Sequence, residues 1–566
     1  MTFTDLLIFI LLVQIIHFLG TWKLYIKAGR KAWEAAIPIY NAIVLMKIIN
    51  RSPWWTLLLF IPIVNLIMFP VIWVETLRSF GRNSNTDTFL GICTFGLYIY
   101  YINYAQEVTY INDRSLKPRT AAGEWISSIL FAVVAATIVH TYVMQPFTIP
   151  TSSLEKTLLV GDFLFVSKFH YGARMPMTAI SFPMVHDSIP VIGTKSYLDK
   201  PQLPYFRLPG FQKIKRNDIV VFSWPTDTLI DINRPGKGFK VKPLDKKSNY
   251  VKRCLGIPGD TLEIIDGFVH TNGVKNILPG RAEVQYTFNA YAQKGVSSRR
   301  LLAEGFEDFN RTYKIQNITE NSFQQLIPYI IGRRGNTVDD FSVITKSKGL
   351  PTKLIGKLGL RVSEILEINK QLTLTIKEAA ILKKTTWIDS IKQQINSVKV
   401  PNESFFPNKI PYDWNEDNFG PLLIPKKGMT IALNRANVPL YKKIIQEYER
   451  NKLEFTPTEI KINGKVANQY TFKKDYYWMM GDNRHKSEDS RFWGFVPDDH
   501  IVGKPVFIWF SIKGINDGIK NWSIRWDRVF TTVDGPGERL SYFPYFMIFI
   551  VLWQGYVFFR KRKSKV

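Results

Sequence analysis

The chain of 566 residues is poor in cysteine, with only Cys93 and Cys254, and it has fewer acidic than basic residues. Two cysteines exclude a small scaffold built from disulfides, and no bridge is expected between one in an apolar run and one in a predicted strand. No cluster has metal-ligand spacing and no phosphate-binding loop occurs, so neither a metal nor a cofactor is expected. Aromatic residues, in contrast, make up 14% of the chain, which excludes disorder.

Lys and Arg number 74 against 47 Asp and Glu, a formal net charge of +27. An excess of this size is typical of proteins that bind nucleic acid or an anionic membrane surface, or that carry basic flanks beside membrane spans. The mean hydropathy of −0.05 is compatible with a membrane protein, because apolar spans and a polar domain average to near zero. The positions of the basic residues must therefore distinguish these classes.

Five apolar segments are candidates for membrane-spanning helices, because about 20 helical residues cross the hydrocarbon layer of a bilayer. Segments 54–74, 125–144 and 542–559 are uncharged and long enough, whereas 89–105 is short and 3–22 contains Asp5. Buried core helices are the alternative, and it is strongest for 89–105. The sequence thus predicts about three spans within residues 1–124, a fourth at 125–144 and a last one at 542–559.

Basic residues orient these spans. They gather in segments 20–53, 106–124 and 560–566, which the positive-inside rule places in the cytoplasm, while segment 76–88 has only two. The N-terminus, segment 76–88 and a large domain of residues 145–541 are then expected outside, and the basic tail inside. This arrangement predicts a multi-pass membrane protein with a large extracytoplasmic domain, and it removes much of the case for nucleic acid.

The outer domain is predicted to be mainly β. Segments 162–169, 218–223, 250–274 and 476–512 are rich in β-branched and aromatic residues between turn residues. Helical spacing at 353–396 and 441–451 indicates a mixed α/β insertion. The predicted parts of the outer domain are a core at 145–274, an insertion at 275–470 and the rest of the core at 471–541.

A short repeat lies in the N-terminal region, where the sequence Ile-Pro-Ile at 37–39 recurs at 61–63, each copy with Asn two residues later. The first copy sits in an apolar run too short to cross a membrane. It is expected to be re-entrant or interfacial, or the two copies are simply similar kinked membrane pieces.

Three motifs carry the functional argument. They are segment 146–162, segment 250–260, which reads Tyr-Val-Lys-Arg-Cys-Leu-Gly-Ile-Pro-Gly-Asp, and segment 480–497, which begins Met-Gly-Asp-Asn-Arg-His-Lys-Ser-Glu-Asp-Ser-Arg. Together with segment 215–222 they resemble the type I signal peptidases (leader peptidases), Ser/Lys proteases that remove signal peptides from exported proteins. The chain departs from the pattern Ser-Met-x-Pro-Thr-Leu of that family, since it has Ser153-Leu-Glu-Lys-Thr-Leu158.

The resemblance implies that Ser153 is the nucleophile and Lys252 the general base. A serine hydroxyl needs a base, and a free lysine with a pKa near 10.4 must be buried to supply a neutral amine near neutrality. On a strand, Lys252 can point into an apolar site while Arg253 faces away. The oxyanion donors implied are the backbone N–H of Ser153 and the hydroxyl of Thr151.

Further residues are implied as supports and as pocket walls. Ser487 is implied to orient the lysine amine, and Asp489 with Arg491, like Asp482 with Arg484, are expected to hold their loop as charged pairs. His485 is expected on the surface, and Trp522 and Trp526 are candidates for a membrane-facing surface. The residues that map to the pockets for the small residues of a signal peptide are Phe147, Ile149, Pro150, Leu154, Tyr250 and Val251.

Other interpretations of the serine are weaker. Ser152-x-x-Glu155 fits a capping box, and Ser153-x-x-Lys156 fits the motif of penicillin-binding enzymes, but the partner motifs of those enzymes are missing. The Gly-x-Ser-x-Gly motif of many Ser-His-Asp hydrolases is missing too. The leading hypothesis is a peptidase that acts on secretory preproteins, in contact with membrane lipid and with the export machinery. The alternative is a non-catalytic membrane assembly or export-accessory protein on the same scaffold.

Overall fold

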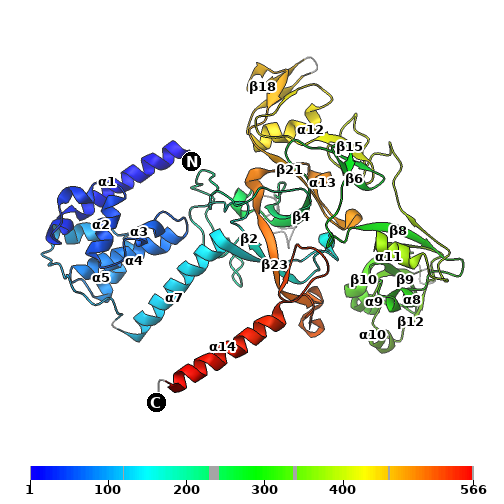
Figure 1. Cartoon of the computed structure of the whole chain (residues 1–566), viewed down its shortest axis with the longest axis horizontal. Helices are drawn as coiled ribbons and strands as arrows, with labels where there is room; N and C mark the ends of the chain where they lie inside the picture. The colour runs from blue at the N-terminus through cyan, green and yellow to red at the C-terminus, as the bar shows by residue number, and fades with distance from the viewer. Residues whose placement is uncertain (1, 119, 228–240, 336–340, 457–458, 564–566) are drawn as a thin grey trace.

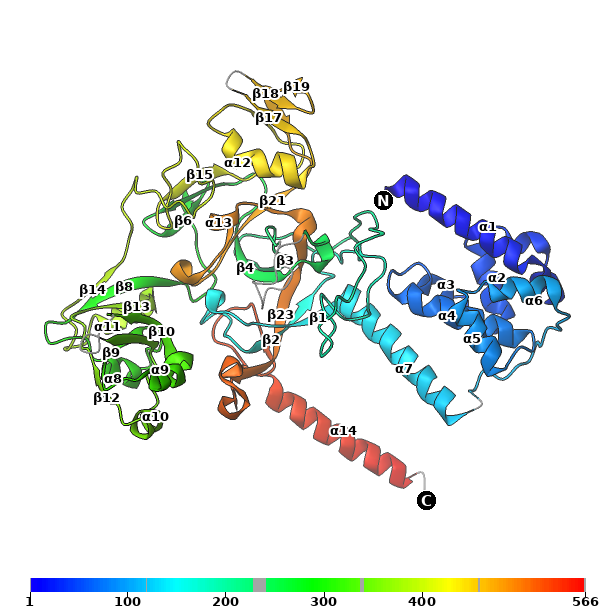
Figure 2. The same cartoon turned by 180° about the vertical axis from the view of Figure 1, so that it is seen from behind.

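The computed structural model describes residues 2–118, 120–227, 241–335, 341–456 and 459–563. A helical N-terminal region lies to one side of a central β domain, and two lobes extend from the other side of that domain (Figure 1). The view from behind shows helices α7 and α14 leaving the β domain on its lower side (Figure 2). The β domain therefore joins all the other parts of the chain.

Three helices in the described residues are long and apolar enough to span a membrane: Phe3–Lys27, Ala121–Val143 and Phe543–Arg560. They correspond to α1 (Phe3–Lys27), to α7 (Ala121–Ile138) with the π-helical turn η2 (Val139–Val143), and to α14 (Phe543–Lys563). The predictions of spans at 3–22, 125–144 and 542–559 agree with these helices.

The predicted spans at 54–74 and 89–105 are wrong, because the backbone breaks inside each of them. The first contains α3 (Trp55–Leu58) and α4 (Val64–Ser79), separated at Ile63 with φ of 72°. The second contains α5 (Asn85–Cys93) and α6 (Tyr98–Ala105), separated at Phe95 and Gly96 with φ of 52° and 82°. Positive φ values are incompatible with a continuous right-handed helix.

Each of these segments is a hairpin that returns to where it started. Glu75 forms ion pairs with Arg51 and Arg114, and the N–H of Ile111 donates to the carbonyl of Ser79 at 2.9 Å. Segments 49–51, 75–79 and 111–114 therefore lie together, and segment 76–88 lies beside 106–114. The expectation that segment 76–88 faces the opposite side from 106–124 is wrong for that reason.

The Ile-Pro-Ile repeat builds the same turn twice. Ile39 and Ile63 have φ of 68° and 72°, and each directly precedes a helix, α2 (Tyr40–Ile48) or α4. In both copies the N–H of the Asn donates to the carbonyl of the first Ile, at 2.9 Å for Asn41 and 3.0 Å for Asn65. The repeat is thus a structural unit at the apex of a helical hairpin.

The β domain is built on a nine-stranded sheet with antiparallel neighbours. Its order is β1-β2-β23-β3-β4-β21-β22, with β24 and β25 beside β23. The strands are β1 (Met144–Thr148), β2 (Asp162–Ser167), β3 (Ile219–Ser223), β4 (Asn249–Gly256), β21 (Tyr476–Met480), β22 (Val496–Pro497), β23 (Ile501–Lys513), β24 (Ser523–Ile524) and β25 (Thr531–Thr532). The strands predicted at 162–169 and 218–223 are confirmed.

Both faces of this sheet are covered, which explains why β3 is apolar along its whole length. Ile219 and Val221 join one hydrophobic cluster, whereas Val220 and Phe222 join another. Alternate side chains of a strand point to opposite faces, so β3 contributes to two cores at once. The same alternation puts Tyr250 and Lys252 of β4 on one face and Val251 and Arg253 on the other.

The first lobe contains two sheets. One has the order β13-β8-β14, with β8 (Gln285–Tyr291), β13 (Asn369–Thr375) and β14 (Ser390–Gln393) beside α8 (Ser298–Ala303) and α11 (Ile376–Leu382). The other has the order β10-β11-β9-β12, with β9 (Asn310–Gln316), β10 (Ile330–Arg334), β11 (Ser342–Lys346) and β12 (Arg361–Glu364) beside α9 (Glu320–Leu326) and α10 (Thr352–Lys357). The prediction of helix over 353–396 is wrong except at α10 and α11.

The second lobe packs on the core. β15 (Phe419–Leu423) pairs with β5 (Thr261–Ile265), which continues to β6 (Phe268–Thr271) and β7 (Val274–Lys275). A single hydrophobic cluster unites Leu262, Phe419 and Trp478. The helix predicted at 441–451 is confirmed as α12 (Val438–Lys443) with the π-helical turn η7 (Ile444–Tyr448). The remaining strands are β16 (Thr430–Ala432), β17 (Leu453–Phe455), β18 (Ile460–Ile462), β19 (Lys465–Val466) and β20 (Gln469–Thr471).

Candidate active site

The predicted nucleophile lies in a short turn between β1 and β2. Ser153 is the middle residue of the 3-10 turn η3 (Ser152–Leu154), and Leu154 anchors the turn in a hydrophobic cluster of the β domain. Thr151 precedes the turn in an extended conformation, and its exposed side chain makes no capping hydrogen bond. The N-cap of the turn is therefore Thr151 and not Ser152, and no side chain caps it. The capping box considered for Ser152 and Glu155 is not formed.

The predicted general base lies next to this turn. Lys252 is on β4, which contacts η3, and only 4% of the lysine is exposed. Burial lowers the pKa of Lys252 to about 8, although Asp489 acts in the opposite direction. Neither the Ser153 Oγ nor the Lys252 Nζ has a hydrogen-bond partner among the residues that the structure describes, so the two groups do not bond to each other here. The Lys252 Nζ lies 5.6 Å from the centroid of the Tyr250 ring.

Gly481 lies between the Ser153 turn and Ser487. A Cβ atom at Gly481 would lie 2.6 Å from the Ser153 carbonyl oxygen and 2.2 Å from the Ser487 Oγ. The loop after β21, which contains Gly481 and Ser487, is held beside the Ser153 turn because the N–H of Asn483 donates to the Ser153 carbonyl at 3.1 Å. The buried Ser487 Oγ has no hydrogen-bond partner in the described part of the chain. The residue type at position 481 therefore sets the distance between the two serines.

Gly481→Ala is expected to reduce preprotein processing about a hundredfold, because the added methyl group must displace the Ser153 turn or Ser487. Gly356→Ala in α10 is the matched control, since no atom lies within 4 Å of the position that its methyl group would take, and it should retain full activity. Processing rates of both variants, with far-UV circular dichroism to monitor folding, check this prediction. Full activity of Gly481→Ala would contradict the close approach of Gly481 to Ser153 and Ser487.

The charged pairs of this loop differ in part from the expectation. Asp489 and Arg491 form the expected pair, with the Arg491 Nε donating to Oδ1 at 2.9 Å, and Asp489 also accepts from the N–H of Gly481 at 3.0 Å. Asp482, in contrast, pairs with Arg253 of β4 at 2.8 and 2.6 Å and not with Arg484. The spacing of two residues does not identify the partner here, because Arg253 is remote in the sequence.

Arg484 is buried without a carboxylate partner in the described residues. Its Nη1 lies 3.9 Å from the Met480 sulfur, its Nε has no partner among those residues, and burial lowers its pKa. It lines a cavity of about 330 Å³ between β6, β7, segment 276–284 and the start of α11. Ser153 and Lys252 do not line that cavity.

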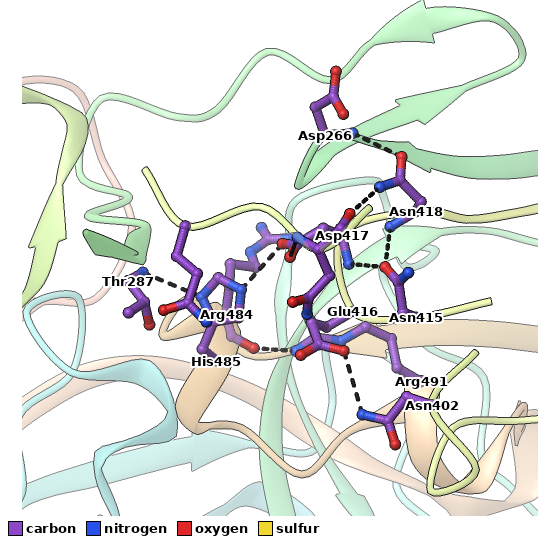
Figure 3. A network of polar contacts seen from close by, with 12 residues as sticks. Asp266, Thr287, Asn402, Asn415, Glu416, Asp417, Asn418, Arg484, His485 and Arg491 are labelled. Atoms are coloured by element: carbon purple, nitrogen blue, oxygen red, sulfur yellow. Dashed lines mark hydrogen bonds and ion pairs between the residues drawn. The ribbon is translucent and has the colours of Figure 1, made fainter. Parts of the chain in front are cut away.

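His485 does not lie on the surface, in contrast to the expectation from the sequence, but joins the loop to the first lobe. Its Nδ1 accepts from the N–H of Thr287 in β8 at 3.1 Å, and its Nε2 lies 3.0 Å from Asp417 Oδ1 (Figure 3). The Nδ1 is therefore the acceptor and Nε2 carries the hydrogen. Asp417 is held in turn by Asn415 and by the N–H of Asn396.

A second connection joins the first lobe to the Ser153 turn. Lys156 has φ of 68°, a value that a proline cannot adopt, and its ammonium pairs with Glu378 of α11. The N–H of Glu283 donates to the Thr157 hydroxyl at 3.0 Å. The departure from the Pro of the family pattern at position 156 thus coincides with a contact to the first lobe, which the sequence alone did not reveal.

Four of the six predicted pocket residues lie together. Ile149, Leu154, Val251 and Phe147 belong to one hydrophobic cluster, and Pro150 is exposed nearby in the same loop as Ile149. Tyr250 is separate, since it stacks on Trp224 at 5.0 Å on the other face of the sheet. Trp522 and Trp526 are 44% and 56% exposed, and Trp526 contacts Phe543 of α14 at 5.4 Å between ring centroids.

The structure thus combines a mainly β domain, a buried lysine beside a serine turn, and apolar helices long enough to span a membrane. The family model for signal peptidase, peptidase S26, matches residues 122–323 and 424–510, just over half of the chain. The chain therefore belongs to the signal peptidase family, peptidase S26, whose members are serine endopeptidases that process signal peptides. A second model, for a family of unknown function (DUF5684), matches residues 33–113.

Curated relatives agree with this assignment and confirm the resemblance. Signal peptidase I of Haemophilus influenzae is 24% identical over 422 residues, which cover 74% of this chain and 78% of the relative. Signal peptidase I of Buchnera aphidicola subsp. Acyrthosiphon pisum is 24% identical over 68% of this chain and 74% of the relative. Signal peptidase I of Rickettsia massiliae is 30% identical over a shorter stretch, 29% of this chain and 48% of the relative.

Proposed function

We propose that the chain removes signal peptides from secretory preproteins with Ser153 as nucleophile and Lys252 as general base. The observation that carries the proposal is the burial of Lys252 on β4 beside the turn that holds Ser153. Burial lowers the pKa of Lys252 to about 8, so a substantial fraction of the amine is neutral near physiological pH. A neutral amine can accept the proton of a serine hydroxyl.

The reaction has two acyl-transfer steps. Lys252 takes the proton from the Ser153 Oγ, which attacks the scissile carbonyl, and the ammonium then gives that proton to the leaving amine. Water, activated by the same lysine, hydrolyses the acyl-enzyme. The oxyanion is stabilised by the N–H of Ser153 and the hydroxyl of Thr151, and Ser487 orients the amine of Lys252. The pair of Asp489 with Arg491 and the pair of Asp482 with Arg253 hold the loop, and neither these residues nor Arg484 transfer a proton.

The substrate is an extended peptide with small residues before the cut. β1 lies at the end of the sheet and pairs only with β2 among the described strands, so a peptide can add to its open edge. Ile149, Leu154 and Val251 form apolar walls that accept small side chains. Phe147 and Pro150 complete the proposed binding surface, whereas Tyr250 lies on the other face of the sheet and is not part of it.

The active site faces the outer side of the plasma (inner) membrane in this proposal. Helices α1, α7 and α14 are the three spans, with the N-terminus and residues 145–541 outside and the basic tail inside. Basic residues in 20–53, 106–124 and 560–566 support this orientation. Two of the five expected spans are hairpins that do not cross the membrane. Removing two crossings moves segment 76–88 to the inner side and leaves the N-terminus, residues 145–541 and the basic tail on the sides expected from the sequence.

Processing is expected to accelerate as pH rises through about 8, because the neutral form of Lys252 is the active one. The measurement is kcat/KM for a purified preprotein between pH 6 and 10, with the full chain in detergent and the cut mapped by N-terminal sequencing of the product. Cleavage after a small residue with an alkaline-rising profile supports the proposal. A rate that falls over this range would exclude Lys252 as the base.

A further inference from the structure

A second cavity, of about 130 Å³, lies at the outer end of α7, away from Ser153. Its walls come from the turn η2, the segment after β2, the 3-10 turn η5 (Leu244–Lys246) and the apex residue Ile63 of the α3–α4 hairpin. The titratable residues that line it are His140, Lys168, Arg174, His186, Asp245 and Lys246. Basic side chains thus predominate in this cavity.

The one carboxylate among the described lining residues is already occupied. Asp245 accepts from the N–H of Met177 at 3.0 Å and from the N–H and hydroxyl of Thr178 at 2.9 and 2.7 Å. Arg174 donates to the carbonyl of Asp499 and to the hydroxyl of Ser223, which are neutral acceptors. No ion pair within 4.0 Å neutralises a basic residue of this cavity in the described part of the chain.

Lys246 and Lys168 differ in their partners. Lys246 donates to the Ser181 hydroxyl at 2.6 Å, whereas the Lys168 ammonium has no hydrogen-bond partner among the described residues. The backbone of Lys168 is fixed, since its N–H donates to the carbonyl of Val143 at 3.0 Å. The backbone of Lys168 is therefore fixed at the cavity, and its ammonium has no anionic partner among the described residues.

Burying an ammonium group without an anionic partner lowers the free energy of unfolding. Burial and the nearby Arg174 lower the pKa of Lys168 to about 7. A bound anion would reverse this effect, because an opposite charge within a few ångströms favours the ammonium form and supplies charge-assisted hydrogen bonds. Arg174 and Lys246 provide further positive charge at the same cavity.

The position of the cavity indicates the source of the anion. Its lining includes residues of η2 and β1, where α7 enters the β domain, and Ile63 at the apex of the α3–α4 hairpin. Phe182 and Met184 also line it, and they are 58% and 46% exposed. Basic groups combined with exposed apolar side chains match a phosphate that carries acyl chains.

We propose that this cavity binds the phosphate group of a membrane phospholipid, with Lys168 as the main ligand and Arg174 and Lys246 as supporting charges. Ile63 places the N-terminal hairpins at the same cavity, so a bound lipid would connect them to the peptidase domain. This site is separate from Ser153 and Lys252, and the proposal does not depend on their roles.

The test is thermal unfolding of the full chain in a neutral detergent with added lipid. Short-chain phosphatidylglycerol is expected to raise the Tm, whereas diacylglycerol of the same chain length, which lacks the phosphate, and inorganic phosphate alone should not. Lys168→Gln should weaken the apparent affinity for the lipid about tenfold or more, as expected for the loss of a hydrogen bond to a charged group. Lys213→Gln, an exposed residue of the same domain, is the matched control and should bind as the wild type does.

Lys168→Arg keeps the charge and should retain most of the binding, which tests the site even where Lys168→Gln unfolds. Equal Tm shifts with diacylglycerol and phosphatidylglycerol would overturn the proposal. An equal shift with inorganic phosphate would overturn the assignment to a lipid. Unchanged lipid affinity of a folded Lys168→Gln variant would remove Lys168 as the ligand.

Discussion

Lys252→Met is expected to reduce preprotein processing by about a thousandfold or more at every pH, because no other base replaces the amine. Ser153→Ala should lose a similar factor, since the two residues act as one unit and their losses do not add. Single-turnover cleavage of a preprotein by the full chain, with each variant and with the double variant, measures these effects. The rates of all three variants should be nearly equal.

Matched controls separate chemistry from folding. Ser152→Ala changes the neighbouring residue of the same turn, and Lys465→Met removes an exposed lysine of β19, so both should retain activity. Cleavage by Lys252→Met at more than a tenth of the wild-type rate would reject the dyad. An inactive wild type with a folded β domain would instead favour the non-catalytic export-accessory role.

Lys252→Met should also be more stable than the wild type at neutral pH. The pKa of Lys252 falls from 10.5 to about 8 on folding, so the folded state binds this proton less tightly than the unfolded chain. The resulting penalty is fully present below pH 8 and disappears as pH rises toward 10.5. Methionine removes it, which corresponds to at most about 3 kcal/mol at pH 7. A loss of activity with a gain in stability is a signature that simple misfolding cannot produce.

The strands and motifs of the β domain were accessible from the sequence because local patterns determine them. Alternating or continuous apolar runs such as 162–169 identify strands, and the segments around Ser153 and Lys252 carry the resemblance to the family. Burial of Lys252 was expected from the resemblance, because a lysine that acts as a base needs a lowered pKa, and its place on a strand allowed it to point inward. The identification of the family therefore needed no tertiary information.

The membrane region shows where local patterns fail. Hydropathy measures whether a segment is apolar, and 54–74 and 89–105 are, but it does not report backbone breaks. Pro62 and Gly96 were the available signals, because each disfavours a continuous helix. The contacts between Glu75, Arg51 and Arg114 that close the hairpins join segments far apart in the sequence.

The charged loop of the active site illustrates the same limit. Asp482 and Arg484 are two residues apart, yet Asp482 pairs with Arg253, 229 positions away. His485 bonds to Thr287, and Lys156 to Glu378, across similar separations. At 369–375 the apolar residues fit the spacing of a strand as well as that of a helix. This segment forms the strand β13 because it pairs with β8. Long-range partners of this kind do not follow from spacing.

Arg253→Met is expected to lower the free energy of unfolding by about 3–5 kcal/mol, because it leaves the carboxylate of Asp482 buried without its counter-ion. Both residues are fully buried, and the pair is bidentate at 2.8 and 2.6 Å. Burial would raise the pKa of Asp482, but Arg253 and the Thr157 hydroxyl outweigh it and hold the pKa below the ordinary value. In the wild type this carboxylate therefore contributes stability above about pH 4, which is lost as pH falls further.

The pH dependence distinguishes this mechanism from a loss of packing. Without Arg253, burial should raise the pKa of Asp482, so the variant should become more stable, relative to the wild type, as pH falls from 7 to 5. Urea unfolding of the full chain in detergent, followed by tryptophan fluorescence at both pH values, measures this change. Arg299→Met, at an exposed position of α8, is the control and should change stability by less than about 0.5 kcal/mol. The double variant Arg253→Met/Asp482→Asn should recover part of the lost free energy of unfolding, because it removes the unpaired charge. If the double variant were as unstable as Arg253→Met at both pH values, the effect would be assigned to packing alone.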